Sequence, residues 1–549
     1  MTTLPLPTDG TPQRPKLHGR AFYESIGSPK YVVAPMVDQS EFAWRMLSRS
    51  FLPEAERSRM LAYTPMFHAR LFAESAKYRD AHFEATRAPS DPSAPYLDGN
   101  PAFDRPLFVQ FCANDPAHLL AAARLVAPHC DAVDLNLGCP QGIARKGRYG
   151  AFLQEDQALV HRLVRALADG LPVPVTAKIR VLDTPEATLA YARNVLAAGA
   201  SVLAVHGRRR DQKGHYTGLA DWRVIRYLRD NLPADTVLFA NGNVLTHADL
   251  ERCLAATGAD AVMSAEGNLS DPAIFAAPPP EGDDLGREYW RGHDGKGGYR
   301  VDAVMRRYMD ILHRYVLGQE PPQRRPLFLP GDDAAWLEEP ASPPPPQPVH
   351  AQPETTNGDE PARKKRKQEG RRAPDDAKAS HNARSSPNLA SVQAHLFHLL
   401  RHLVARHTDV RDALARARKG DLTVFEGILD QVERKIARGL VEHARTRGRS
   451  IEAEWAAEDA KAAAKPPAAP DEEGPDGQDG GGAESSVRTV RACRRPWWIV
   501  QPIVRPLPRE AMANGAITLK GQKSGAPGRG KAREGGTGVE VEARGRRNV

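Results

Sequence analysis

The chain has 549 residues, enough for two or three domains, and its 44 glycines and 47 prolines are too many for one compact domain, so we expect long unstructured linkers. Five cysteines exclude a disulfide scaffold, no C-x-x-C pair offers a zinc site, and we find neither a membrane-spanning apolar run nor a signal peptide, so we expect a soluble intracellular protein with no membrane partner. The formal net charge is +8 at pH 7, and it is concentrated at the end of the chain.

The first 290 residues repeat one unit, a short β-rich apolar run followed by a helical pattern. Eight runs begin at Tyr31, Leu61, Pro106, Ala132, Pro174, Ser201, Thr236 and Ala261. They lack polar alternation, which is typical of parallel strands covered on both faces. Eight units over roughly 250 residues predict an α/β fold, a TIM (β/α)8 barrel spanning 29–290, after a disordered segment at 1–28. An open doubly wound sheet is the rival, but no Gly-x-Gly-x-x-Gly follows the first run.

Helical patterns return after the predicted barrel, over 299–339 and 388–445. In the second stretch an apolar stripe of helical spacing is formed by Leu396, Leu399, Leu400 and Leu403. We therefore expect a small all-α helical domain in two pieces.

A proline-rich, charged segment separates the two pieces, and we expect this insertion, residues 340–387, to be disordered. Its basic cluster, Arg363–Lys367, favours a nuclear-import signal over a solvated linker, hence a nuclear or cytoplasmic location. The segment 446–549 has the composition of a low-complexity basic tail, apart from RRPWWIVQPIVRP around Trp497 and Trp498. Residues 481–549 hold fourteen Lys or Arg against five Glu, which suits an anionic partner, nucleic acid first, and equally a tail that charge keeps in solution.

Nearly every predicted strand ends in a polar or conformationally special residue. In chain order these are Pro35 and Met36, Met66, Gln110, Asn136 with Cys139, Lys178, His206, Asn241–Asn243 and Ala265–Gly267. Active sites of such barrels lie at the carboxyl ends of the strands, and a barrel built only for packing has no need of this convergence.

The predicted strand ends suggest individual tasks. Glycines in the loops at Asn241–Asn243 and Ala265–Gly267 let backbone N–H groups approach a phosphate. Lys178 inside the fifth strand would be costly to bury without an anion or an electron-rich ring beside it. His206 and Gln110 could hydrogen-bond the same ligand.

Cys139 stands on a polar loop, between Gly138 and Pro140, where a thiol does not serve core packing. It could act as a nucleophile or as a proton donor. The nearby Arg145 and Lys146 would attract phosphate. The remaining cysteines, at 112, 130, 253 and 493, have no evident chemical role.

Together these stretches resemble the tRNA-dihydrouridine synthase family. The motifs that carry this resemblance are APMVDQSEFAWR from Ala34, YTPMFHARLF from Tyr63, VQFCANDP from Val109, the loop around Cys139, KIRV from Lys178, VHGR from Val205, NGNV from Asn241 and SAEGN from Ser264. APMVDQSE, HARLF and CPQGIA look most like the eukaryotic branch acting on uridines 16 and 17 of the tRNA D-loop. HLFHLLRHL and its neighbours resemble that family's C-terminal helical domain, which recognises RNA.

The resemblance implies bound FMN, with NADPH or NADH as the reductant. By position, Pro35, Met36 and Val37 would line the flavin ring, Gln110 would bond its polar edge, and Lys178 would face the N1/O2 side. The ribityl phosphate would be held by His206, Asn241, Gly242, Asn243, Ala265 and Glu266.

The same resemblance implies reduction of the uridine C5=C6 bond, with hydride from FMN to C6 and a proton from Cys139 to C5. The base must leave the stack to reach the barrel mouth, where Asn136 and Arg180 would read its polar edge. Arg145 and Lys146 would contact the RNA, and the helical domain with the basic segments would bind tRNA through its phosphates.

Two alternatives compete with this interpretation. One is an FMN barrel acting on a free pyrimidine, such as a dihydroorotate or dihydropyrimidine dehydrogenase, since those enzymes share the Asn-x-x-Cys-Pro type of loop. The appended basic helical domain argues against it. The other is an RNA-binding protein that keeps a degenerate, inactive barrel as a scaffold, and the intact set of flavin-contacting positions argues against that.

Overall fold

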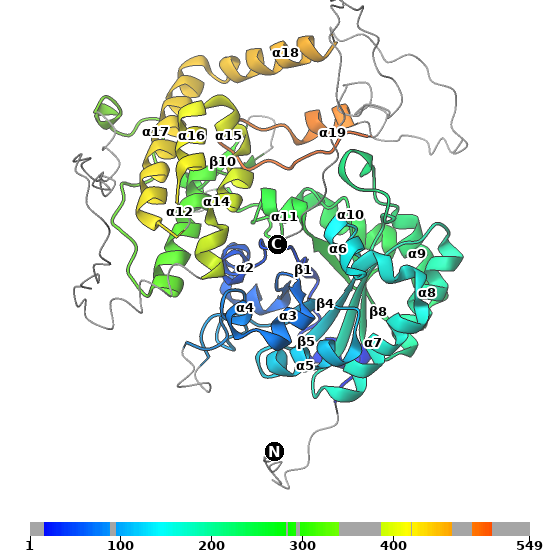
Figure 1. Cartoon of the computed structure of the whole chain (residues 1–549). Helices are drawn as coiled ribbons and strands as arrows, with labels where there is room; N and C mark the ends of the chain where they lie inside the picture. Colours follow the sequence, from blue (N-terminus) through cyan, green and yellow to red (C-terminus); the bar gives the residue numbers. More distant parts are fainter. Residues whose placement is uncertain are drawn as a thin grey trace, which may run out of the picture.

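The computed structural model describes residues 16–87, 95–281, 284–292, 297–339, 386–418, 420–463 and 486–507. Its centre is a closed parallel barrel (Figure 1) of β1 (Tyr31–Val33), β2 (Met60–Tyr63), β4 (Leu107–Cys112), β5 (Ala132–Leu137), β6 (Val175–Arg180), β7 (Val202–His206), β8 (Val237–Asn241) and β9 (Ala261–Ser264). The strand order is β2-β1-β9-β8-β7-β6-β5-β4, and pairing of β2 with β4 closes the ring. A short β3 (Phe67–His68) pairs with the end of β4. The predicted (β/α)8 barrel is confirmed.

Five long helices cover the outside of the barrel: α5 (Pro116–Val126), α7 (Gln157–Gly170), α8 (Pro185–Ala197), α9 (Trp222–Asn231) and α10 (His247–Thr257). Their starts are encoded locally. Asp115 accepts a hydrogen bond from the His118 N–H (2.8 Å) and Thr184 one from the Ala187 N–H (3.1 Å), and each cap is followed by proline at the first helical position. None of the helices in the described ranges has the length and apolar character needed to cross a bilayer.

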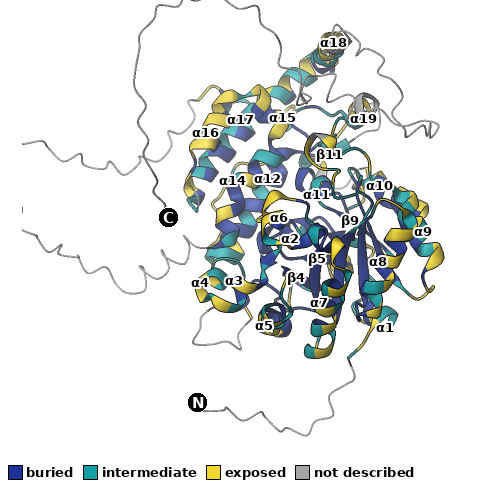
Figure 2. Ribbon diagram, turned by 45° about the vertical axis from the view of Figure 1, so that its right-hand side comes forward, coloured by how far each residue is buried: buried dark blue, intermediate teal, exposed yellow. Residues whose placement is uncertain are grey.

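Shorter elements fill the loops of the barrel. They are α2 (Phe42–Ser50), η1 (Glu54–Arg59), α3 (Ala69–Glu74), α4 (Ala76–Asp80), η2 (Ala127–His129), α6 (Gly142–Gly147), η3 (Gly150–Glu155), η4 (Gly214–Tyr216), α11 (Glu266–Ser270) and η5 (Asp284–Arg287). Every residue of β2, β4, β5, β8 and β9 is buried, so the strands are dark in Figure 2. This is why the strands read as continuous apolar runs.

The N-terminal segment differs from the prediction. Residues 1–28 were expected to be disordered, but α1 (Gly19–Ser25) is a helix, so the expectation is wrong for the part that is described. Phe22 and Tyr23 are buried, with ring centroids 5.8 Å from those of Phe108 and Phe239 respectively. Phe108 is the second residue of β4, and the Tyr23 hydroxyl donates to the carbonyl of Asp260, directly before β9, at 3.2 Å, so α1 packs against the amino end of the barrel. A seven-residue helix held by two aromatic side chains gives too little periodicity for recognition in the sequence.

The helical part follows an antiparallel hairpin of β10 (Tyr289–Arg291) and β11 (Gly297–Tyr299). It contains α12 (Val301–Ile311), a π-helical turn η6 (Leu312–Leu317), η7 (Ala335–Leu337), α14 (Pro387–Leu399), α15 (Arg401–Arg406), α16 (Thr408–Arg416) and α17 (Leu422–Thr446). These helices lie side by side beside the barrel (Figure 1), and α12 packs on α17. The predicted stripe from Leu396 to Leu403 is buried, although the helix breaks at Leu400. The expected insertion lies outside the described residues from 340 to 385, Arg363–Lys367 included.

A buried polar contact ties the helical part to the barrel. The His395 ring stacks on Trp44 of α2 with centroids 4.0 Å apart, and its Nε2 lies 3.0 Å from both carboxylate oxygens of Glu41. The amide oxygen of Asn388 accepts a hydrogen bond of 2.7 Å from the Ala43 N–H. Because His395 and Asn388 are fully buried, α14 is docked on α2 in one orientation.

The C-terminal part also differs from the prediction. The expectation that 446–549 forms only a low-complexity tail is wrong over α18 (Arg449–Ala463) and over 486–507, where α19 (Ser486–Cys493) leads into an extended stretch. We call residues 494–507 the C-terminal segment. Trp498 in it is fully buried, the Val301 N–H donates to the Trp498 carbonyl (2.9 Å), and the Val500 N–H donates to the Tyr299 carbonyl (3.0 Å). The segment is therefore part of the folded core.

Candidate active site

The parallel register places the predicted strand-end residues in two neighbouring rows near the carboxyl end of the barrel. Asn136 on β5 lies opposite Lys178 on β6, and Arg180 on β6 lies opposite His206 on β7. His206 in turn lies opposite Asn241 on β8. Residues far apart in the chain are therefore brought to one mouth, as the sequence predicts.

The Cys139 loop is held by hydrogen bonds from both sides. The Asn136 side-chain oxygen accepts from the backbone N–H groups of Gly138 (3.1 Å) and Cys139 (2.9 Å). The Arg180 Nε donates to the Gly138 carbonyl at 2.8 Å. Gly150 packs against this loop at φ +65°, and a Cβ there would lie 2.8 Å from the Cys139 carbonyl oxygen. The half-buried Cys139 thiol is thus carried on a fixed backbone.

Gln110 and Asn136 belong to a buried network around Asp134. The Gln110 amide nitrogen donates to the Asp134 carboxylate (2.8 Å), and its oxygen accepts from the Asn136 amide (2.8 Å). The Thr176 hydroxyl donates to the other Asp134 oxygen at 2.6 Å. Burial raises the pKa of Asp134 to about 6, against the opposing effect of the Thr176 and Gln110 hydrogen bonds. In this structure Asn136 therefore positions the Cys139 loop, and its predicted contact with the base stays a prediction.

Three cationic side chains near the carboxyl ends of the strands have lowered pKa values. Burial, reinforced by Arg180, lowers the pKa of Lys178 to about 8, although its Nζ donates to the Asn241 amide oxygen at 3.0 Å. Burial and the charge of Arg208 lower the pKa of Arg180 to about 10. Burial also lowers the pKa of Arg208 to about 10. Such a cluster favours an anionic ligand, because an anion would relieve the cost of holding these charges in a desolvated site.

His206 is surrounded by the same charges. Burial, together with Arg180 and Lys178, lowers its pKa well below the ordinary value, so the ring is neutral at physiological pH. The Arg208 guanidinium lies 3.1 Å from His206 Nε2, and it also donates to the Asn243 side-chain oxygen at 2.6 Å. His206 and Asn243, both predicted from the sequence, are therefore linked through Arg208.

The loop after β8 has a backbone that requires glycine. Gly242 has φ +112°, and a Cβ there would lie 2.6 Å from the Ala220 Cβ and 3.0 Å from the His206 ring. Trp222 fixes the loop by donating its indole N–H to the Gly242 carbonyl at 2.8 Å. Asn243 follows in the left-handed region, with φ +58°. We call Gly242, Asn243 and Arg208 the anion cradle.

A cavity of about 2570 Å³ opens over this side of the barrel mouth. The predicted residues on its wall are Arg180, His206, Asn241, Gly242, Asn243, Ala265 and Glu266. The other predicted residues lie outside that wall: Pro35, Met36, Val37, Gln110, Asn136, Cys139, Arg145, Lys146 and Lys178. Lys178 and Asn136 are nevertheless joined to it, through the Lys178–Asn241 bond and the Arg180–Gly138 bond.

The remaining predicted residues lie after β1 and on α6. Pro35, Met36 and Val37 follow β1, and only Met36 of the three is buried. Arg145 and Lys146 are exposed on α6, directly after the Cys139 loop.

Some residues of the site were missed by sequence reasoning. Arg208 could have been found from VHGR, where it follows His206 by two positions. Asp134 shares its strand face with Asn136, and a carboxylate inside an apolar run is a signal in itself. No sequence signal indicates that Arg505, from the C-terminal segment, lies on the same cavity wall.

Comparison with known proteins agrees with this geometry. The Dihydrouridine synthase (Dus) family model matches residues 32–283. Over 493 residues the chain is 37% identical to the tRNA-dihydrouridine(16/17) synthase of Schizosaccharomyces pombe, and the match covers 90% of this chain and 92% of that protein. The chain belongs to the dihydrouridine synthase family. The resemblance seen in the sequence is confirmed.

Other members of the family match over the barrel. The tRNA-dihydrouridine(16/17) synthase of Saccharomyces cerevisiae is 54% identical over 297 residues, which are 54% of this chain and 63% of that relative. A Rattus norvegicus protein named as tRNA-dihydrouridine(16/17) synthase-like is 46% identical over 276 residues, which are 50% of this chain and 58% of the relative. These two matches span less than two thirds of the relatives' lengths. All three names also specify NAD(P)(+).

Proposed function

We propose that the protein is a tRNA-dihydrouridine synthase that reduces the C5=C6 bond of uridine 16, uridine 17 or both in the tRNA D-loop. The names of the fungal relatives support the substrate. The observation that carries the proposal is the Cys139 loop, fixed by Asn136 and Arg180 beside a mouth lined with buried cations. A free pyrimidine would not require the docked helical part or the exposed Arg145 and Lys146 next to this loop.

The residues of the mouth fit FMN as the cofactor. The anion cradle presents a guanidinium and a glycine backbone to a phosphate, and Lys178 offers a buried ammonium to an electron-rich ring edge. His206 is neutral and can donate or accept one hydrogen bond beside the cradle. When bound and reduced by NADPH or NADH, FMN would supply the hydride that uracil accepts at C6.

In this proposal the protein supplies the proton. Saturating C5=C6 requires a proton at C5 as well as the hydride at C6, and Cys139 is the acid we assign to C5. Its loop is held at Gly138 and Cys139 by the Asn136 side chain, so the backbone that carries the thiol is fixed without help from the substrate. Lys178 would hold negative charge at the ring edge, and exposed Arg145 and Lys146 would bind RNA phosphates.

The test is an absorbance spectrum of the purified protein, followed by NADPH addition with and without unmodified tRNA. We expect flavin bands that NADPH bleaches and that recover without oxygen only when tRNA is added. Recovery with a free pyrimidine would favour the dehydrogenase alternative. A colourless protein that binds tRNA would leave only the alternative of an inactive RNA-binding scaffold.

The role of Cys139 has its own test. Cys139→Ala should keep flavin and tRNA binding and lose turnover on unmodified tRNA by about 10²–10⁴-fold, the usual contribution of a general acid. Cys253→Ala, on the outer helix α10, is the matched control and should keep its activity. Turnover of Cys139→Ala equal to that of the control would remove Cys139 from the proton-donor role.

A further inference from the structure

The C-terminal segment is anchored between the helical part and the barrel. The Trp498 ring meets Trp290 and His443 edge-on, with centroids 6.3 Å and 5.6 Å apart. Beyond this anchor, the wall of the large cavity includes Val500 and the stretch from Pro502 to Arg505. Figure 1 shows the segment above α11, near the mouth of the barrel. A stretch distant in sequence thus closes one side of the site.

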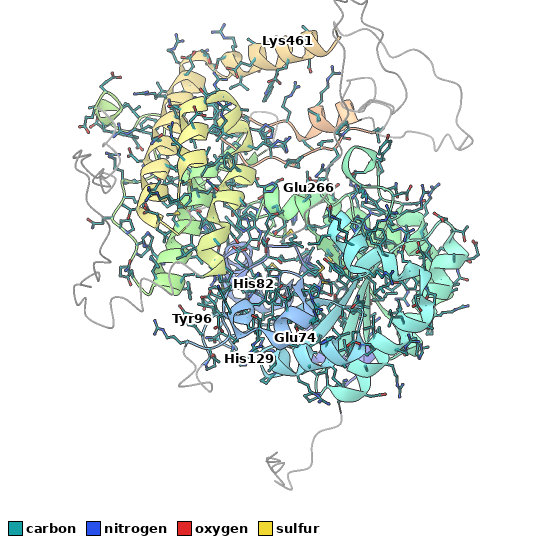
Figure 3. All side chains as sticks on the ribbon, in the orientation of Figure 1. Glu74, His82, Tyr96, His129, Glu266 and Lys461 are labelled. Carbon is teal, nitrogen blue, oxygen red and sulfur yellow. The ribbon has the colours of Figure 1, made fainter. Side chains whose placement is uncertain are left out.

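Arg505 connects this segment to the loop after β9. Its guanidinium donates to both carboxylate oxygens of Glu266, at 2.7 Å and 3.2 Å. Glu266 is the first residue of α11, and in Figure 3 it lies between the barrel and the helices of the C-terminal half. Both side chains are partly exposed and both line the cavity that contains the anion cradle.

Glu266 would oppose a phosphate at the anion cradle if its charge were not balanced. The carboxylate is close enough for its charge to raise the pKa of Arg208, while the charge of Arg505 lowers it. A phosphate dianion in the cradle would therefore be repelled by Glu266 and attracted by Arg505. The ion pair brings the net charge of the two side chains to zero on the wall that the phosphate approaches.

We propose that Arg505 is a positioning residue for the flavin phosphate. By holding Glu266 in an ion pair, it neutralises this carboxylate and lets an anion occupy the cradle of Gly242, Asn243 and Arg208. The inference rests on the proposed function, because the anion is the phosphate of FMN. It also gives the C-terminal segment a role in cofactor binding that the barrel alone does not provide.

The experiment measures equilibrium binding of FMN and of riboflavin to the full-length, deflavinated protein by quenching of flavin fluorescence. For Arg505→Ala we expect the Kd of FMN to rise by about three- to ten-fold, in keeping with a half-exposed ion pair next to a dianion. Riboflavin lacks the phosphate, so its Kd should not change. The double variant Glu266→Gln/Arg505→Ala should regain part of the FMN affinity that Arg505→Ala loses, because the carboxylate that needed balancing is gone.

Arg494→Ala is the matched control. Arg494 belongs to the same segment but pairs with Asp459 of α18 at 3.1 Å, away from the cavity wall, so FMN affinity should be unchanged. An unchanged FMN Kd in Arg505→Ala would overturn the inference. So would a loss that the double variant does not recover, or one that riboflavin shares, since the first indicates direct phosphate contact and the second a structural role. If the wild-type protein binds neither flavin, the proposed function fails with it.

Discussion

Replacing Lys178 by methionine should stabilise the flavin-free protein and weaken its affinity for FMN. Lys178 is 9% exposed, and its ammonium donates to the Asn241 amide oxygen at 3.0 Å. Across the residues that the structure describes, no carboxylate forms an ion pair with it. Methionine keeps a similar length and removes the charge.

The size of the effect follows from the pKa of Lys178. Burial and Arg180 lower it from 10.5 to about 8. At 1.36 kcal/mol per pKa unit, the charged side chain costs the folded state about 3 kcal/mol at pH 7. The variant also loses a hydrogen bond worth roughly 1 kcal/mol, which leaves a net stabilisation of about 2 kcal/mol.

The direction in which the free energy of unfolding changes with pH can be tested as well. The folded pKa lies below the unfolded value, so the unfolded chain binds more protons between pH 8 and pH 10.5. The free energy of unfolding of the wild type therefore rises with pH across that window, and the advantage of the methionine variant should shrink by about 1 kcal/mol at pH 9.

Urea unfolding of the flavin-free proteins at pH 7 and pH 9 measures both quantities, and fluorescence titration measures the loss of FMN affinity. Lys77→Met, at an exposed position on α4, is the control and should change neither. A Lys178→Met protein that is less stable than the wild type at pH 7, or whose advantage is the same at pH 9, would refute the reasoning.

Three further changes test other parts of the structure. Gly242→Ala places a Cβ at φ +112° and 2.6 Å from the Ala220 Cβ, so it should cost about 1–3 kcal/mol in urea unfolding and about ten-fold in FMN affinity; wild-type flavin binding would contradict the cradle. Trp498→Ala removes a fully buried ring and should cost about 3–5 kcal/mol, and an unchanged Tm in calorimetry would count against the anchor. Arg401→Glu, exposed on α15, should weaken tRNA binding and reduce its salt dependence in filter binding, while NADPH still reduces the flavin; equal tRNA affinity would separate this face from the RNA.

The barrel could be predicted because its signals are local and repeated. Each strand reads as an apolar run, since both faces are buried, and each outer helix carries its own cap, as Asp115 and Thr184 do. The predictions that failed concern short segments that are held by contacts with residues distant in the sequence. The α1 helix is held by Phe22 and Tyr23 against strands more than eighty residues away, and nothing near Trp498 in the sequence shows which surface buries it.

The sequence indicates which residues belong to the candidate site, but it does not indicate which of them contact one another. Strand ends identified Asn136 and Gln110, because a parallel barrel gathers them at one mouth. Only the structure shows that the Asn136 amide donates to Gln110, that Gln110 donates to Asp134, and that the Asn136 side-chain oxygen supports the Cys139 loop. Spacing along a strand gives the face on which a residue lies, but which partner it meets across the barrel depends on closure and register.

The buried cations are the residues at the barrel mouth that indicate most clearly what kind of ligand binds there. Burial lowers the pKa values of Lys178, Arg180 and Arg208, so the charged forms of these side chains are disfavoured in the folded protein unless an anion is bound. Stability alone would replace them with apolar side chains of similar size. If the protein binds FMN as we propose, the phosphate and the electron-rich ring would restore favourable surroundings for these charges, and that energy would contribute to cofactor affinity. The Lys178→Met variant measures that exchange directly, since one substitution should raise stability and lower cofactor affinity together.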